Sequence, residues 1–186
     1  TVWNGRSQDF MRWHVPGETY SVTGFIRWVE LMACTGGNDA RDLFRDPHDR
    51  TTLDDYRFDA LVKACRGILR MGAKPYLKLG NVPPKFSSDY DGGEFAMNVR
   101  PPDDPRAHYR YMRALARTLR DAFGRDEVRG WRYAVLTEAD NAGWFSVKSQ
   151  DAAETRERFF ELYDWTALAF EEELGGGLTF GTHLLY

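Results

Sequence analysis

The chain has 186 residues, of which 42% are hydrophobic and 28% charged, so it can form one packed globular domain. Its net charge of -3 gives no general attraction for nucleic acid, and no run approaches the ~20 apolar residues of a membrane-spanning helix. The two cysteines offer no metal-ligand spacing. Composition therefore excludes a membrane protein and argues against a nucleic-acid partner or a cysteine-based metal site.

Two strands with a helix between them are predicted in the first half of the chain. Residues 22–33 are rich in β-branched and aromatic side chains and end at a glycine-rich turn signal, which indicates a strand. Behind a cap region at Thr51 and Thr52, apolar residues recur at helical spacing: Phe58, Leu61, Val62, Cys65, Ile68 and Leu69. The short apolar run over residues 75–80 predicts the second strand.

The second half of the chain repeats this alternation. A loop over residues 81–104 leads to a helix whose apolar face ends at Gly124. A strand follows over residues 131–138, then a helix that stops at the glycines 175–177, and a last strand over residues 178–183. Four strands alternating with three helices indicate the α/β class, with a parallel sheet and right-handed crossovers.

The charged residues of these helices are interpreted as solvated. Three consecutive carboxylates, Glu171 to Glu173, come near the end of the third helix and receive no catalytic role. Arginines recur at helical spacing on the second helix and predict a solvated outer face, namely Arg106, Arg110, Arg113, Arg117 and Arg120.

Loop placement distinguishes between two parallel α/β folds. A doubly wound nucleotide fold has a G-x-G-x-x-G turn after its first strand, and residues 35–38 do not match it. The long loops follow strands while the helix-to-strand connections are short, as in a (β/α)8 TIM-type barrel with its site at the carboxyl ends of the strands. Because a complete barrel usually takes about 250 residues, we expect residues 1–186 to form a single, partial barrel domain.

The most informative stretch covers residues 126–145. Glu138 occupies the last position of the predicted strand, where a carboxylate can reach a substrate in the mouth of a barrel. Here the sequence resembles glycoside hydrolase family 39, the β-xylosidase and α-L-iduronidase family, whose fourth strand runs from a Trp into an Asn-Glu pair. In that family the Glu is the acid/base, and Glu138 falls on it.

The resemblance extends well beyond this strand. Residues 56–83 look like the family's second helix and third strand, including a Gly-x-Lys-Pro turn at residues 72–75. Ile26 and Arg27 look like the end of the second strand, and residues 160–164 look like the helix after the fourth. The order of the family is kept over roughly residues 22–186, which is far more specific than one short motif.

Three departures from the family concern the substrate. Thr137 stands where the family has the Asn that holds the 2-hydroxyl of the sugar, and a hydroxyl can make only part of that contact. Residues 139–140 (Ala-Asp) replace Pro-Asn, and residues 29–30 (Val-Glu) replace His-Gly. These replacements imply an altered grip on the sugar.

A further departure concerns the second carboxylate of the mechanism. The family's nucleophile is a Glu on the seventh strand, whereas this sequence stops at Tyr186, in or just after the position of the fifth. We therefore expect the chain to be part of a longer barrel. Glu30 alternates with Arg27 along the first predicted strand, so only one of the two can line the interior, and the resemblance assigns this place to Arg27.

The resemblance implies a retaining glycosidase that cleaves O-glycosidic bonds, with Glu138 protonating the leaving oxygen, and a role in carbohydrate and polysaccharide degradation. It implies no metal or organic cofactor and a carbohydrate substrate as partner. The open edges of a four-stranded sheet separately suggest self-association that covers them. The rival hypothesis is a non-catalytic carbohydrate-binding or scaffold protein on the same barrel. Trp144 is a candidate stacking platform for a sugar ring. The substrate-binding candidates are Arg27, Thr137, Asn141, Trp144 and His183.

Overall fold

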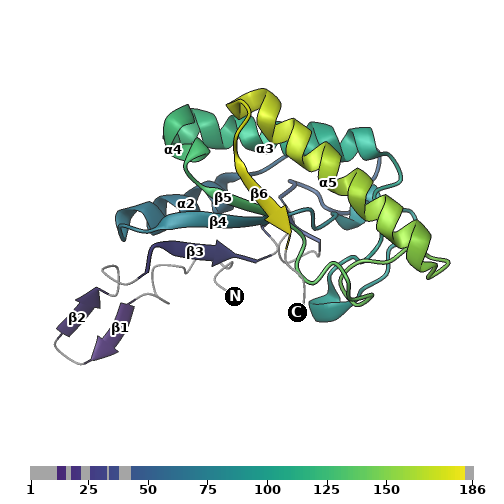
Figure 1. Ribbon diagram of the computed structural model, residues 1–186, viewed down its shortest axis with the longest axis horizontal. Helices are drawn as coiled ribbons and strands as arrows, with labels where there is room; N and C mark the ends of the chain where they lie inside the picture. Colours follow the sequence, from purple (N-terminus) through teal and green to yellow (C-terminus); the bar gives the residue numbers. More distant parts are fainter. Residues whose placement is uncertain (1–11, 16–17, 22–25, 33, 38–42, 183–186) are drawn as a thin grey trace.

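The computed structural model describes residues 12–15, 18–21, 26–32, 34–37 and 43–182. Four strands form one sheet in the order β3-β4-β5-β6, and each neighbouring pair is parallel, as the sequence predicted (Figure 1). Strand β4 (Lys74–Leu79) has the predicted length but begins one residue earlier. The other three strands are shorter than predicted: β3 (Trp28–Leu31), β5 (Arg132–Val135) and β6 (Thr179–Thr182). The carboxyl ends of all four strands therefore meet at one edge of the sheet.

A two-stranded antiparallel sheet precedes this core. It consists of β1 (Arg12–Val15) and β2 (Glu18–Ser21), and its register joins Trp13 to Tyr20. The sequence analysis did not predict this hairpin and began its first strand at residue 22. Residues 22–25 and 33 of that expected strand, like His183 at the end of the last one, lie outside the described residues.

Capping side chains mark the first turn of the two longest helices. Asp104 caps α3 (Pro105–Phe123) and Asp151 caps α5 (Ala152–Leu174), each accepting a hydrogen bond from a backbone N–H of the first turn. The expected cap region at Thr51 and Thr52 is wrong, because α2 (Asp59–Arg70) begins behind Phe58. The remaining helical segments are α4 (Arg125–Arg129) and the 3-10 turns η2 (Pro84–Phe86) and η3 (Glu94–Ala96).

The two faces of the sheet differ in chemistry. Figure 1 shows α3 and α5 over one face, where alternate strand residues such as Leu77, Leu79 and Val135 are buried in the main core. The opposite face carries polar and aromatic side chains: Arg132 lies 4.4 Å from the ring centroid of Trp28, and Lys78 lies 3.7 Å from Glu30. In a closed barrel this second face is the interior.

Helices α3 and α5 are joined by an ion cluster that the sequence analysis missed. Glu173 is buried between them, and its two carboxylate oxygens accept hydrogen bonds from Arg113, Arg117 and Arg120 at 2.7–2.8 Å. Three of the five arginines predicted to form a solvated face therefore bind one carboxylate. Hydrogen bonds from Arg117 and Arg113 lower the pKa of Glu173 to about 2, against the opposing effect of burial.

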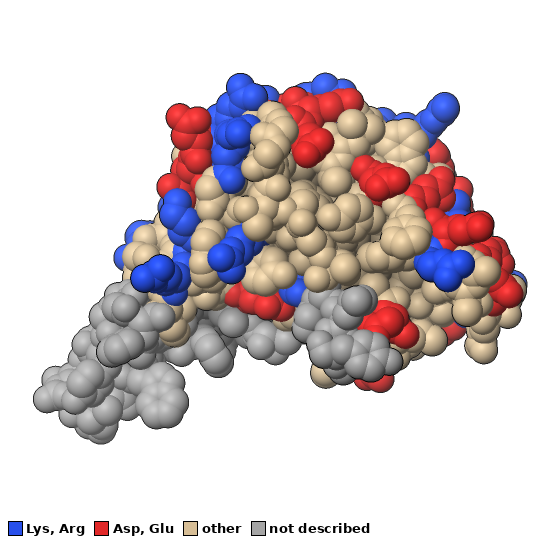
Figure 2. All heavy atoms as spheres, viewed as in Figure 1, with Lys and Arg blue, Asp and Glu red and all other residues tan. Residues whose placement is uncertain are grey.

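Charged side chains of both signs are spread over the visible surface. In Figure 2, Lys and Arg side chains gather mainly towards the left of the face, Asp and Glu side chains are more numerous towards the right, and uncharged side chains cover the centre, over β6 and α5. No helix within the described ranges is long and apolar enough to cross a membrane.

Replacing Glu173 by Gln is expected to lower the free energy of unfolding by about 2 kcal/mol near pH 7, because three charge-assisted hydrogen bonds lose their anionic acceptor. The lowered pKa means that this stabilisation is present above the ordinary value of 4.5 and is lost as the pH falls towards about 2. Urea unfolding at pH 7 and at about pH 3 checks it. The exposed Glu171→Gln is the control, and a deficit of Glu173→Gln that stays the same at both pH values would contradict the prediction.

Candidate active site at the carboxyl edge of the sheet

Strand β5 ends three residues before Glu138, which corrects the expectation that Glu138 is the last residue of the strand. The reason lies in the backbone of Leu136, whose φ of 59° turns the chain out of the extended conformation. The Leu136 N–H still donates to the carbonyl of Leu79, at 2.7 Å. Glu138 also has a positive φ, 49°, and therefore lies on a sharp turn just beyond the carboxyl edge of the sheet.

The turn after β5 directs two hydrogen-bond donors at the Glu138 carboxylate. Trp144 Nε1 lies 3.0 Å and Asn141 Nδ2 lies 3.4 Å from the same oxygen, Oε2. The Asn141 side chain is oriented by its own oxygen, which accepts the Gly143 N–H at 2.9 Å and leaves the amide nitrogen to face Glu138. The structure thus brings together three of the residues that the sequence singled out.

Trp144 contributes its polar edge rather than its ring face. The side chain packs with Met97 in a small cluster apart from the main core, and only 7% of the residue is exposed. A sugar ring needs an open aromatic face, so this conformation does not present Trp144 as the expected stacking platform. Its indole N–H instead holds the orientation of the Glu138 carboxylate.

The loops after β4 and β5 are tied to each other beside this turn. The buried guanidinium of Arg100 donates to the carbonyls of Ser146 and Val147, at 3.2 and 2.8 Å, and to Asp91 Oδ2 at 2.6 Å. Backbone hydrogen bonds join Ser146 N to Val99 O and Glu94 N to Gly143 O, both at 2.9 Å. The site is therefore assembled from two loops that act as one unit.

A glycine allows the closest approach between these loops. A Cβ on Gly93 would lie 2.2 Å from the carbonyl oxygen of Gly143 and 2.2 Å from Val99 Cγ1. Both distances are far below van der Waals contact. The adjacent turn η3 then places Phe95 against Trp144, with 5.9 Å between the ring centroids.

Other residues expected at the site lie elsewhere. The strand runs from Trp28 to Leu31, so Arg27 does not end it but precedes it, exposed at the amino edge of the sheet, where its carbonyl accepts the Lys74 N–H. By alternation from the buried Leu31, it is Glu30 that lies on the face opposite the helices. The structure does not bring Arg27 together with Glu138.

Thr137 is near the site but turned away from solvent. It is buried, and its hydroxyl lies 3.4 Å from the sulfur of Met32, at the end of β3. A hydroxyl in this position has little freedom to bind a sugar. His183 lies outside the described residues, so its expected role stays a prediction.

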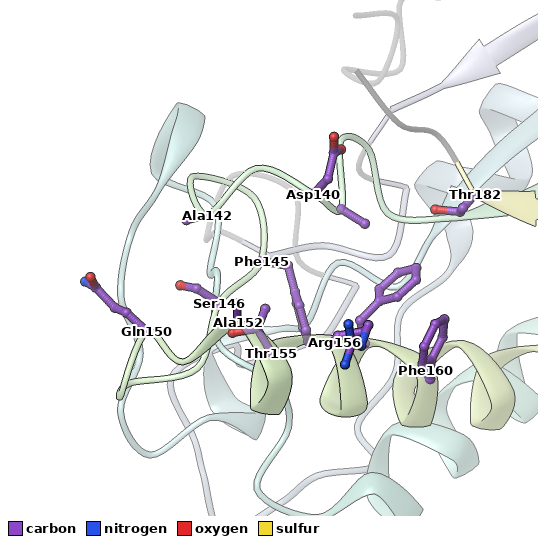
Figure 3. A pocket seen from close by; sticks show the side chains of 12 residues that line it. Asp140, Ala142, Phe145, Ser146, Gln150, Ala152, Thr155, Arg156, Phe160 and Thr182 are labelled. Carbon is purple, nitrogen blue, oxygen red and sulfur yellow. The ribbon is translucent and has the colours of Figure 1, made fainter. Parts of the chain in front are cut away.

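A cavity of about 480 Å³ lies between the loop that follows β5 and helix α5 (Figure 3). It separates residues 139–146 from the first turns of α5, where Arg156 and Phe160 point towards it, and Thr182 of β6 borders it. The side chain of Glu138 is not among its lining residues. The cavity and the candidate acid are thus separate features, and the cavity lies against the last described strand of the sheet.

Comparison with known proteins decides the family. The model of glycosyl hydrolases family 39 matches residues 37–181, which include the sheet from β4 onwards and the turn that carries Glu138. The chain belongs to this family. The resemblance inferred from residues 126–145 and 56–83 is thereby confirmed.

Relatives in the family are much longer than this chain. A β-xylosidase from Caldicellulosiruptor saccharolyticus is 26% identical over 135 residues, which are 69% of this chain and 25% of that protein. A monomeric β-xylosidase from Caulobacter crescentus CB15 superposes with a TM-score of 0.58 at 25% identity, covering 81% of this chain and 28% of that one. A GH39 β-xylosidase from Caulobacter crescentus gives a TM-score of 0.59 at 24% identity, covering 81% and 31%. The four parallel strands are thus an incomplete TIM-type barrel of family 39.

The sequence analysis did not identify two residues of this family 39 site, Phe95 and Arg100. Phe95 and Arg100 lie in the loop over residues 81–104, which has no periodicity that would reveal which side chains are buried. A weak signal was present, because the glycine pair at residues 92–93 is separated from the aromatic Phe95 by a single residue. A glycine pair in a long loop permits close contact with another backbone, but it does not name that backbone.

Replacing Gly93 by Ala is expected to lower the free energy of unfolding by about 1–3 kcal/mol, because the new methyl group must push the two loops apart. Chemical denaturation followed by tryptophan fluorescence measures the loss. Gly176→Ala is the matched control, since a Cβ there meets no atom within 4 Å. Equal stability of the two variants would show that the loops are not in close contact.

Proposed function

We propose that the protein of which this chain forms part hydrolyses O-glycosidic bonds by the retaining mechanism, with Glu138 as acid/base. The observation that carries the proposal is the geometry of Glu138, which lies just beyond β5 with two donors directed at Oε2. These two hydrogen bonds orient the carboxyl group and both end on Oε2. The other oxygen, Oε1, carries the proton that is transferred to the leaving oxygen. In the second step the same group takes a proton from water.

The second carboxylate of this mechanism is proposed to come from outside residues 1–186. Retaining glycosidases place the nucleophile about 5–5.5 Å from the acid. Glu30 forms an ion pair with Lys78 on β4, so its carboxylate already has a structural partner. Burial lowers the pKa of Lys78, and the charge of Glu30 acts in the opposite direction. Because two carboxylates perform the whole reaction, the proposal requires no metal and no organic cofactor.

The substrates to test first are β-xylosides, because the curated relative is a β-xylosidase. Asn141 is proposed as a substrate-binding residue in addition to its contact with Glu138. Residues 1–186 are proposed to form one partial, catalytic-type domain, in which self-association remains a way to cover the edges of β3 and β6.

A second candidate function is carbohydrate binding without turnover. The position of Thr137 favours it, because a buried hydroxyl beside Met32 replaces the amide that family 39 uses to hold a sugar hydroxyl. The variants described next separate the two functions, since a binding protein has no turnover to lose.

In the full-length protein, Glu138→Gln is expected to lower kcat/KM about 10²–10⁴-fold for an alkyl xyloside, whose poor leaving group needs protonation. For 2,4-dinitrophenyl xyloside the loss is expected to stay within about tenfold, because this leaving group departs as a stable anion. Initial rates with both substrates make the comparison, and the exposed Glu157→Gln is the control. Equal losses on the two substrates would show that Glu138 is not the acid.

Residues 1–186 alone are expected to release no phenol from aryl xylosides, glucosides, galactosides or uronides. One carboxylate can donate a proton, but it cannot also form the glycosyl-enzyme intermediate. Turnover by a chain that sediments as a monomer, abolished by Glu138→Ala, would contradict this expectation. A second carboxylate would then be sought within the chain, beginning with Glu30 and Glu94.

A further inference from the structure

Phe95 is the most exposed large apolar side chain among the described residues. It is 70% exposed, whereas Phe160, Tyr90 and Leu168 are 55%, 46% and 43% exposed. Single exposed apolar residues are ordinary on a protein surface. Phe95 differs from the others because its backbone and its neighbour tie it to Glu138.

The backbone holds Phe95 in an unfavourable conformation. Phe95 and Ala96 both have positive φ, 54° and 58°, although neither is a glycine. Hydrogen bonds on both sides of them maintain this turn, from Gly93 N to Met97 O and from Met97 N to Glu94 O. Strain of this kind persists only where the surroundings over-determine the conformation, and it is often found at ligand sites.

The ring of Phe95 continues the set of contacts that begins at the candidate acid. Trp144 donates its indole N–H to Glu138, and Phe95 packs on Trp144 with an angle of 45° between the rings. Trp144 is nearly covered, so the open aromatic surface beside Glu138 belongs to Phe95. Phe95 is thus joined to Glu138 through Trp144 and is itself open to solvent.

We propose that Phe95 is a binding residue for the leaving group, and that it packs against a ring with an apolar face, such as an aryl group or the C–H face of a second sugar. This inference rests on the proposed role of Glu138. The acid must touch the leaving oxygen, and the ring attached to that oxygen extends away from the strand ends. Phe95 is on a loop turn beyond β4 and packs on Trp144, the residue that donates a hydrogen bond to Glu138.

The test measures the affinity of the full-length protein for phenyl and methyl 1-thio-β-D-xylopyranoside by calorimetry, because sulfur-linked glycosides resist hydrolysis. Phe95→Ala is expected to weaken binding of the phenyl compound about fivefold, which is about 1 kcal/mol. Binding of the methyl compound is expected to change less than about twofold, since it has no ring on the leaving side. Phe95→Trp is expected to retain the affinity for the phenyl compound.

The matched control is Phe160→Ala, which removes another exposed phenylalanine, on α5, and is expected to change neither affinity. If Phe95→Ala weakens both compounds equally, or neither of them, the role of Phe95 is overturned while the role of Glu138 stands on its own leaving-group test. The same pairs of glucose, galactose and arabinose thioglycosides extend the test to other sugars. If the unchanged protein binds none of these compounds, the role of Phe95 is overturned, whereas the proposed function is decided separately by the leaving-group test of Glu138→Gln.

Discussion

Arg100 carries its guanidinium group between the loops that follow β4 and β5, and the geometry of the site depends on this one buried cation. It donates to two backbone carbonyls of the second loop and forms an ion pair with Asp91 in the first. A buried charge without such partners would be very costly, so the loops are held where their oxygens accept hydrogen bonds from its two terminal nitrogens, while its Nε makes none within the described residues. Two long irregular segments thereby become a single support for Glu138 and its neighbours.

Backbone strain is concentrated on this support. Leu136, Glu138, Phe95 and Ala96 all have positive φ without being glycines, and each such residue costs on the order of 1 kcal/mol or more. The main core, which includes Leu77 and Leu79 of β4, offsets that cost with ordinary apolar burial. The stable sheet thus supports a strained edge, and Glu138 and the exposed ring of Phe95 both belong to that edge.

Membership of family 39 explains the architecture but not every contact at the site. The amide expected next to Glu138 is replaced by Thr137, whose hydroxyl faces Met32, and residues 29–30 within β3 differ from the family pattern as well. Asn141 and Trp144 nevertheless hold the Glu138 carboxylate from within its own turn. The donors that orient the Glu138 carboxylate therefore come from its own turn, and the Arg100 contacts hold that turn against the loop after β4.

The sequence by itself determined the parallel α/β class, the family and the position of Glu138 near the end of a strand. All three features follow from hydrophobic periodicity and from local motifs, which can be recognised within short stretches of sequence. It did not reveal that Glu173 is buried among arginines, because a helical charge pattern does not show which neighbouring helix covers it.

The tertiary structure alone decided which aromatic ring is open, since Trp144 is covered by Met97 and Phe95 from a loop more than forty residues earlier. It also separated Arg27 from the site, because one residue of offset at the start of β3 moves a side chain out of the strand. Contacts between loops distant in sequence depend on shape and on hydrogen-bond satisfaction, which no local pattern encodes.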